Sequence, residues 1–243
     1  MDAPWEDSGW EHLAADVGRR RLPGWDATVG LVAGTDAALL YDTGSTLREG
    51  REIRIAAEAL LGGRRVTHIA LSHPHFDHVL GTAVFAGVQV YGAVGLDGLL
   101  ARNSRGAEVL RHDAVRHGVP ASQAAEAVAH LVAPHHMVSG ELTLDLGGRQ
   151  VVLADCGPGH TGHDLALYVP GSPGVVFCGD LVEESGEPQA GPDAFPAQWP
   201  AALDRLLALG GEDARYVPGH GAVVDAAFVR AQRDVLAARS GVS

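Results

Sequence analysis

The stretch 73–78 constrains this chain more than any other feature, because it places three imidazoles and one carboxylate within six positions. Such side chains are ligands that suit Zn²⁺, Fe²⁺ or Mn²⁺. The apolar, β-branched run 66–71 precedes it and predicts a strand that ends in a loop. In an extended chain the first and third residues of the stretch point to one side. We therefore expect these two histidines to meet one metal, and the Asp-His pair that follows to face a second.

Three later segments also carry His or Asp beside glycine at the ends of apolar runs. They are Gly-His-Thr-Gly-His-Asp at 159–164, Phe-Cys-Gly-Asp at 177–180 and Tyr-Val-Pro-Gly-His-Gly at 216–221. Glycine lets the backbone of such a segment come close to a site. An isolated His or Asp is a weak signal, but four such segments together favour a two-metal site.

These motifs together resemble the metallo-β-lactamase superfamily. The similarity rests on the pattern His-x-His-x-Asp-His at 73–78, on the later His, Asp and His, and on the Asp-Thr-Gly run at 42–44, and it spans roughly residues 25 to 225. The resemblance implies that two metal ions are held by seven side chains. The first ion would be held by His73, His75 and His160, the second by Asp77, His78 and His220, and Asp180 would bridge both.

The same resemblance implies a binuclear hydrolase with two divalent ions, above all Zn²⁺, with iron or manganese as alternatives. A hydroxide that bridges the metals would attack an electrophilic carbon or phosphorus atom. The resemblance makes Asp77 the catalytic residue, which orients this nucleophile. Asp42 and Thr161 are candidates for fixing the orientation of the ligands, with ordinary turn chemistry as the alternative for both.

Two other function classes remain open. One is a mononuclear iron dioxygenase of the persulfide dioxygenase type, in which His73, His160 and Asp180 would hold the iron. The retention of all seven ligand positions weighs against it. The other is a catalytically silent metal-binding module. Structural metal sites are normally closed and rich in cysteine, whereas this set consists of His and Asp.

The charge around the later motifs limits the substrate. Residues 150–204 contain eight acidic residues and neither Arg nor Lys, so a strongly anionic substrate would depend on Arg102, Arg105 or Arg111 of the middle segment, or on Arg205. This disfavours β-lactams and phosphodiesters and leaves a small, largely neutral ester, thioester, lactone or amide. In the Gly- and Pro-rich segment 183–200, Phe195 and Trp199 either line a substrate pocket or pin the loop to the body.

Composition and the spacing of the motifs limit the number of domains, the partners and the compartment that we expect for this protein. The ligand positions spread from 73 to 220 must converge, so we expect residues 1–243 to form one domain. A net charge of −12 argues against nucleic acid as a partner, and no apolar run is long enough to cross a membrane. Two cysteines and an acidic N-terminus without signal-peptide features favour the cytoplasm and free thiols. Apolar helix faces near the C-terminus would also suit a homodimer.

The pattern of periodic segments predicts an α/β fold. We expect strands at 27–33, 37–42, 66–71, 89–91, 142–146, 149–154, 165–169, 175–178 and 216–217, and helices at 48–61, 79–85, 199–209 and 226–238. This order suits a four-layer αβ/βα sandwich with the metals at one edge between the sheets. A helical insertion at about 93–133, with helices at 97–101, 107–117 and 122–131, would either wall the site as a lid or cap the sheet.

Overall fold

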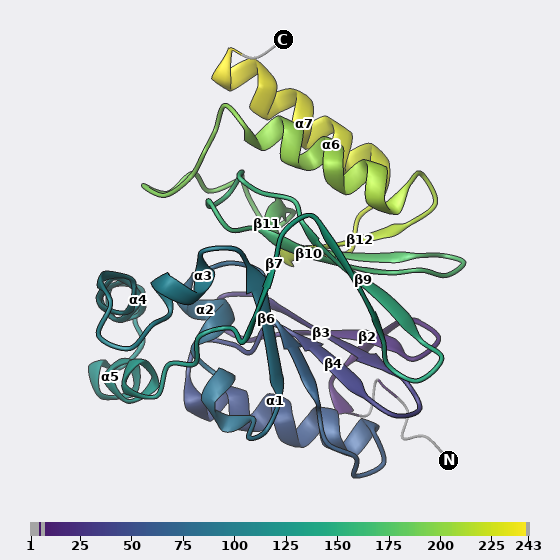
Figure 1. Cartoon of the computed structure of the whole chain (residues 1–243). Helices are drawn as coiled ribbons and strands as arrows, with labels where there is room; N and C mark the ends of the chain where they lie inside the picture. The colour runs from purple at the N-terminus through teal and green to yellow at the C-terminus, as the bar shows by residue number, and fades with distance from the viewer. Residues whose placement is uncertain (1–4, 6–7, 242–243) are drawn as a thin grey trace.

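The computed structural model describes Trp5 and residues 8–241 (Figure 1). The prediction that the N-terminus carries no signal peptide rests on residues 1–16, of which residues 1–4, 6 and 7 lie outside the described part of the chain. Within them, no helix combines the length and apolar character needed to cross a membrane. Both cysteines, Cys156 and Cys178, are buried free thiols.

The first sheet has seven strands in simple sequence order, from β1 to β7. The first four pair antiparallel and the last four pair parallel, with β4 common to both sets. The strands are β1 (Glu11–Ala14), β2 (Val17–Arg21), β3 (Thr28–Ala33), β4 (Ala38–Tyr41), β5 (His68–Ala70), β6 (Gln89–Ala93) and β7 (His136–Val138).

The second sheet has five strands in the order β12-β11-β10-β9-β8. Its members pair antiparallel except β11 and β12, which run parallel. The strands are β8 (Glu141–Asp145), β9 (Gln150–Asp155), β10 (Leu165–Val169), β11 (Val175–Glu183) and β12 (Arg215–His220).

Helices cover the outer face of each sheet (Figure 1). Beside the first sheet lie α1 (Leu47–Leu60), α4 (Arg105–Arg116) and α5 (Ala121–Ala129), and beside the second lie α6 (Trp199–Gly210) and α7 (Ala226–Ser240). Shorter helical segments are α2 (Phe76–Val79), η2 (Thr82–Val84) and α3 (Leu96–Leu99).

Three hydrophobic clusters hold the layers together. The first joins α1 to the outer face of the first sheet, as Ile53 packs with Leu40 and Val90. The second fills the space between the sheets, where Leu39 and Phe177 meet. The third lies between the second sheet and α6 and α7. Alternate strand residues serve different clusters because side chains alternate between the faces of a sheet. The predicted four-layer sandwich is therefore confirmed.

Some predicted element boundaries are wrong. Helix α2 begins at Phe76, inside the histidine-rich stretch, rather than at 79. Strand β11 continues to Glu183 rather than ending at 178, because its parallel pairing with β12 resumes after register shifts around Gly179. Strand β7 was not predicted. It has three residues and pairs only along one edge of the sheet, so it leaves little periodicity to detect.

The insertion packs as a cap on the first sheet. Leu110 and Ala114 of α4 and Ala124 of α5 belong to the same cluster as Ile53 of α1. Its buried side chains therefore serve the core, which favours the capping role over a lid. One side chain of the insertion contacts the histidine-rich stretch. The imidazole of His117, just after α4, stacks on the ring of Phe76 with centroids 5.5 Å apart.

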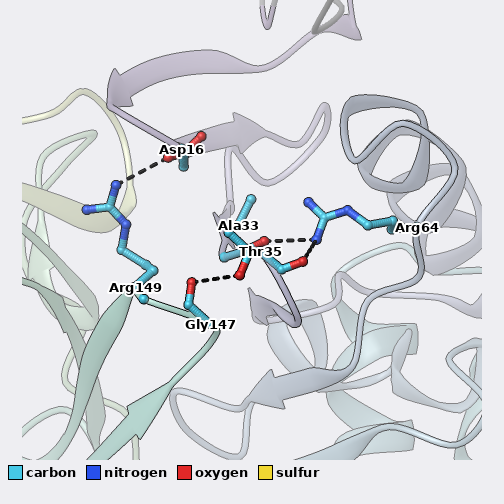
Figure 2. Close-up of a pocket in the computed structure, with 8 residues that line it drawn as sticks. Asp16, Ala33, Thr35, Arg64, Gly147 and Arg149 are labelled. Carbon is cyan, nitrogen blue, oxygen red and sulfur yellow. Dashed lines mark hydrogen bonds and ion pairs between the residues drawn. The ribbon is translucent and has the colours of Figure 1, made fainter.

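The β3–β4 turn and the β8–β9 turn are hydrogen-bonded to each other where the two sheets meet, and we call this contact the clasp (Figure 2). The backbone amides of Asp36 and Ala37 donate to Leu146 O at 3.1 and 3.0 Å, and the Thr35 amide donates to Gly147 O at 3.2 Å. Arg64 supports this clasp by donating to Gly34 O and Thr35 O at 2.8 and 2.9 Å. An open cavity of ≈ 290 Å³ lies between these turns.

Removing the Arg64 guanidinium should weaken the clasp. We expect Arg64→Ala to lower the free energy of unfolding by about 1 kcal/mol, because carbonyl oxygens of the first turn lose their charged donor. Urea unfolding of the metal-free protein measures this loss. Arg65→Ala is the matched control, because Arg65 donates to one carbonyl, Ala86 O, away from the clasp. Equal losses in the two variants would contradict the prediction.

Candidate metal centre

The structure brings all seven predicted ligand side chains together. They form two groups in which the potential ligand atoms lie within 4.8 Å of one another. One group contains His73, His75, His160 and Asp180, and the other contains Asp77, His78 and His220.

Asp180 links the two groups. Its Oδ2 lies 3.6 Å from His73 Nε2 and 3.5 Å from His160 Nε2 of the first group. The same carboxylate lies 3.2 Å from His78 Nε2 and 3.4 Å from His220 Nε2 of the second. Four imidazoles from three segments of the chain therefore face a single carboxylate.

Secondary structure explains how the histidine-rich stretch supplies both groups. After β5 the chain bends at His73 and Pro74, where the His75 amide donates to His73 O at 3.0 Å, and this bend carries His73 and His75. The chain then turns into α2, so that Asp77 and His78 sit in the first turn of a helix and face the second group. A short helix so soon after a strand changes the side-chain direction within the motif.

Asp42 holds His78 in place. Its Oδ2 lies 2.8 Å from His78 Nδ1, and its Oδ1 accepts from the Ser72 amide at 2.8 Å. Asp42 is buried and has a positive φ of 62°, a conformation that Asp tolerates better than most residues. One carboxylate thereby orients a candidate ligand and fixes the end of the strand that bears the motif.

Thr161 does not play the corresponding part for His160. Its amide and hydroxyl donate to Asp164, the hydroxyl at 2.7 Å, and its Oγ1 accepts from the His163 amide. Among the described residues it makes no hydrogen bond to any of the seven side chains. The prediction that Thr161 orients a ligand is corrected: it closes its own turn, because a hydroxyl two or three residues from an Asp is readily satisfied locally.

The other four histidines also have a partner on the nitrogen that faces away from the cluster. His73 Nδ1 lies 2.8 Å from Ser72 Oγ, and His220 Nδ1 lies 2.7 Å from Trp25 O. The remaining two pairs are His160 Nδ1 with Gln189 O at 3.1 Å and His75 Nε2 with Asp193 Oδ2 at 3.0 Å.

These four partners were not predicted. Two of them are main-chain oxygens, which leave no trace in side-chain identity. Asp193 did carry a signal, as an acid in the Gly- and Pro-rich segment after Asp180. Its significance depends on where that loop folds, and the pattern of residues does not reveal this.

The inward atoms of the cluster fit metal ions. His73 Nε2, His78 Nε2 and Asp180 Oδ1 are buried and have no hydrogen-bond partner. Buried polar atoms are rarely left unpaired, because each unmade hydrogen bond costs about 1–3 kcal/mol. Imidazole nitrogens and carboxylate oxygens that converge in this way are a donor set suited to Zn²⁺, Fe²⁺ or Mn²⁺.

A comparison with protein-family models agrees with this arrangement. The model described as the metallo-beta-lactamase superfamily matches residues 22–220. The chain belongs to the metallo-beta-lactamase superfamily. This match includes all seven candidate ligands and leaves only the first strands and the last helix outside.

Solved structures of metallo-beta-lactamases share the fold. The protein from Pontibacter korlensis superposes with a TM-score of 0.68 at 20% identity, covering 93% of this chain and 97% of that one. FIM-1 from Pseudomonas aeruginosa, in its mono-zinc form, gives 0.67 at 18% identity, covering 95% of each chain. The Hirschia baltica protein gives 0.66 at 14% identity, covering 93% and 96%. A search of curated proteins finds no match.

These comparisons establish a superfamily fold of metal-dependent hydrolases with candidate metal-binding residues. At such low identity, the similarity to solved structures concerns the fold alone. The substrate must be argued from this chain's own side chains.

The charges within this superfamily site are strongly coupled. Burial alone would lower the pKa of His220, but the carboxylates of Asp180 and Asp77 outweigh it and raise the pKa to about 12. The same carboxylates, with Asp42, raise the pKa of His78 well above its usual value despite burial. Burial lowers the pKa of His160 to about 4. Without metal at neutral pH, His78 and His220 are therefore protonated and His160 is neutral.

Metal binding should consequently release protons. A metal ion needs the lone pair that carries the proton in His78 and His220, and Asp193 outweighs burial to raise the pKa of His75 as well, so two or more protons should leave at pH 7. Zinc affinity should therefore weaken as the pH falls from 8 to 6. Calorimetric titration of zinc into stripped protein, in buffers of different ionisation enthalpy, counts the released protons. Binding with no proton release and no dependence on pH would contradict this assignment of charges.

Trp199 and Phe195, which were predicted either to line a substrate pocket or to pin the loop, lie in different environments. Trp199 is fully buried at the start of α6, and its Nε1 donates to Leu181 O at 3.0 Å. It packs against His160 with ring centroids 5.5 Å apart, so it pins the loop rather than meeting substrate. Phe195 is 41% exposed, its ring lies beside Gly162, and its amide donates to Gly159 O.

Arg205 also differs from its predicted role. Its guanidinium donates to Cys156 O at 2.8 and 2.6 Å and to Gly157 O at 2.9 Å. It supports the chain that leads to His160 and is not a free cation for an anionic substrate.

Proposed function

We propose that this protein is a binuclear metal-dependent hydrolase of a small ester, thioester, lactone or amide. The observation that carries the proposal is the position of Asp180, whose carboxylate faces histidines of both ligand groups at 3.2–3.6 Å. One metal would be held by His73, His75 and His160, a second by Asp77, His78 and His220, and Asp180 would be common to both. Zinc is the ion that these donors suit best.

Divalent ions in this position would supply a water of lowered pKa and polarise the attacked carbonyl group. The residues of the chain orient the reactants and move protons. The Asp77 carboxylate lies 3.4 Å from His220 Nε2 and 3.5 Å from His78 Nε2, and its side chain is buried within the cluster. It is the group placed to accept a proton from the attacking water.

The surroundings favour a neutral substrate. Three arginines in the N-terminal strands and α6 already have partners. Arg19 donates to Glu11 and Gly221 O, Arg21 pairs with Asp26, and Arg205 donates to backbone carbonyls. Asp193 adds a further negative charge beside His75. An anionic substrate would therefore meet the metals but would find these three guanidinium groups already paired, which supports esters, thioesters, lactones or amides over β-lactams and phosphodiesters.

Metal content per chain tests the proposal. Protein purified without added metal is analysed by plasma mass spectrometry and then assayed on neutral nitrophenyl esters, thioesters, lactones and amides. About two zinc ions per chain with hydrolysis of one class would support it. One iron per chain with oxygen consumption on a persulfide would replace it with the dioxygenase alternative. Full zinc occupancy without turnover across the panel would favour the catalytically silent module.

A further inference from the structure

The loop between β11 and α6, residues 184–198, binds the outward ring nitrogens of histidines on one side of the metal cluster. Two histidines of the first ligand group find their outward partners in it, His75 through Asp193 and His160 through Gln189 O. The outward partners of His78 and His220 lie elsewhere, in Asp42 and in Trp25 O. The loop thus orients two imidazoles of the first group, whereas its hydrogen bond to the second group, from the Glu184 amide to His220 O at 3.1 Å, involves only the main chain.

His75 differs from the other candidate histidines in the atom that it presents. His73, His78, His160 and His220 turn Nε2 toward the cluster and use Nδ1 outward. His75 turns Nδ1 inward, 3.0 Å from His160 Nε2, and uses Nε2 outward to Asp193. A half-turn of its ring would replace the inward nitrogen by carbon, so an outward partner is needed to hold the orientation.

Asp193 is placed to provide this hold. It lies in a tight turn in which the Ala194 amide donates to Gly191 O at 3.1 Å. Two residues on, the Phe195 amide donates to Gly159 O at 2.9 Å, next to His160. The carboxylate is 48% exposed, so as an ion pair it adds little stability to the fold. Its effect lies in orienting a ligand, where an outer partner typically changes metal affinity by about 10–100-fold.

We infer that Asp193 is a positioning residue for one metal of the pair. The affinity for this metal then depends on the 184–198 loop, separately from the affinity for the other metal. The inference rests on the proposed binuclear site. It divides the site into one ion whose histidines have no outward partner in the loop and another for which two histidines, His75 and His160, depend on this exposed loop.

Zinc competition against a chromophoric chelator tests this inference. For the wild type we expect two tight zinc ions per chain. For Asp193→Ala we expect one ion to keep its affinity and the other to bind about 10–100-fold more weakly. Asp193→Asn retains an acceptor oxygen without the charge and should fall between the two. The matched control is Glu187→Ala, which removes a carboxylate of the same loop that pairs with Arg239 at 3.2 Å. It should bind zinc like the wild type.

Several results would overturn the inference. These are unchanged affinities in Asp193→Ala, equal weakening of both ions, or the same loss in Glu187→Ala. Urea unfolding of the zinc-free variants should give the wild-type midpoint, which separates ligand orientation from loss of fold. A wild type that binds only one ion contradicts the proposed function instead. The inference is then decided by whether Asp193→Ala weakens that single ion.

Discussion

Replacing Asp180 by alanine should reduce both metal content and hydrolysis, the latter by at least about 100-fold. The carboxylate faces four histidines of the two groups, so its removal takes away the one negative charge that both share. Burial would raise the pKa of this carboxyl, but His78, His220 and His73 hold it well below the usual value. The native site therefore contains a carboxylate, and no neighbouring residue can replace it. Plasma mass spectrometry and a rate assay at saturating zinc measure the two effects.

Glu183→Gln is the control for this experiment. Glu183 is also a buried carboxylate of β11, but it accepts from Ser185 Oγ and belongs to neither ligand group. Glutamine keeps an acceptor oxygen, so metal content should stay at the wild-type level. A fully active, fully loaded Asp180→Ala protein would sink the binuclear proposal.

Replacing Gly219 by alanine should damage both the fold and the metal site. An added Cβ would overlap Asp180 Oδ1 and lie 2.8 Å from the carbonyl carbon of Gly179. Neither group can yield easily, because β11 and β12 pair at this point and Asp180 faces the histidines. Overpacking of this kind costs about 3 kcal/mol. We expect a lower urea midpoint and, in the surviving folded protein, loss of bound zinc.

A glycine in open space provides the comparison. Gly98 lies in α3, and an added Cβ would meet no atom within 4 Å. Gly98→Ala should therefore leave the unfolding midpoint and the zinc content near those of the wild type. Comparable losses in both variants would show that the damage is not steric.

Much of this fold could be predicted because its core strands have clear boundaries. The runs that became β3, β4 and β10 are apolar and end in glycine or charged residues, so their limits were close to those observed. Prediction failed where tertiary contacts override local signals. Gly179-Asp180 resembles the end of a strand, yet pairing with β12 carries β11 past it.

The candidate site divides in a similar way. The seven inward side chains could be named from the sequence because their motifs resemble those of a known superfamily, and the fold brings them together. The groups that hold these side chains in place were harder to predict. Asp42 has a neighbouring Thr-Gly pair that marks a special turn, whereas Trp25 O and Gln189 O serve through the main chain. Trp199 was predicted either to line a pocket or to pin the loop, and it lies in the core between β11 and α6.

The distribution of the ligands between the two halves has a mechanical consequence. Each ligand group draws side chains from the loop after β5, in the first half, and from the second half. Bound metal would therefore act as a cross-link between the two sheets, comparable to a pair of disulfides but reversible. The β3–β4 and β8–β9 clasp joins the same sheets through fixed backbone hydrogen bonds. The free energy needed to separate the two sheets at the edge that holds the metals would then rise with the free zinc concentration, because a ligand that binds only the folded state stabilises it by mass action.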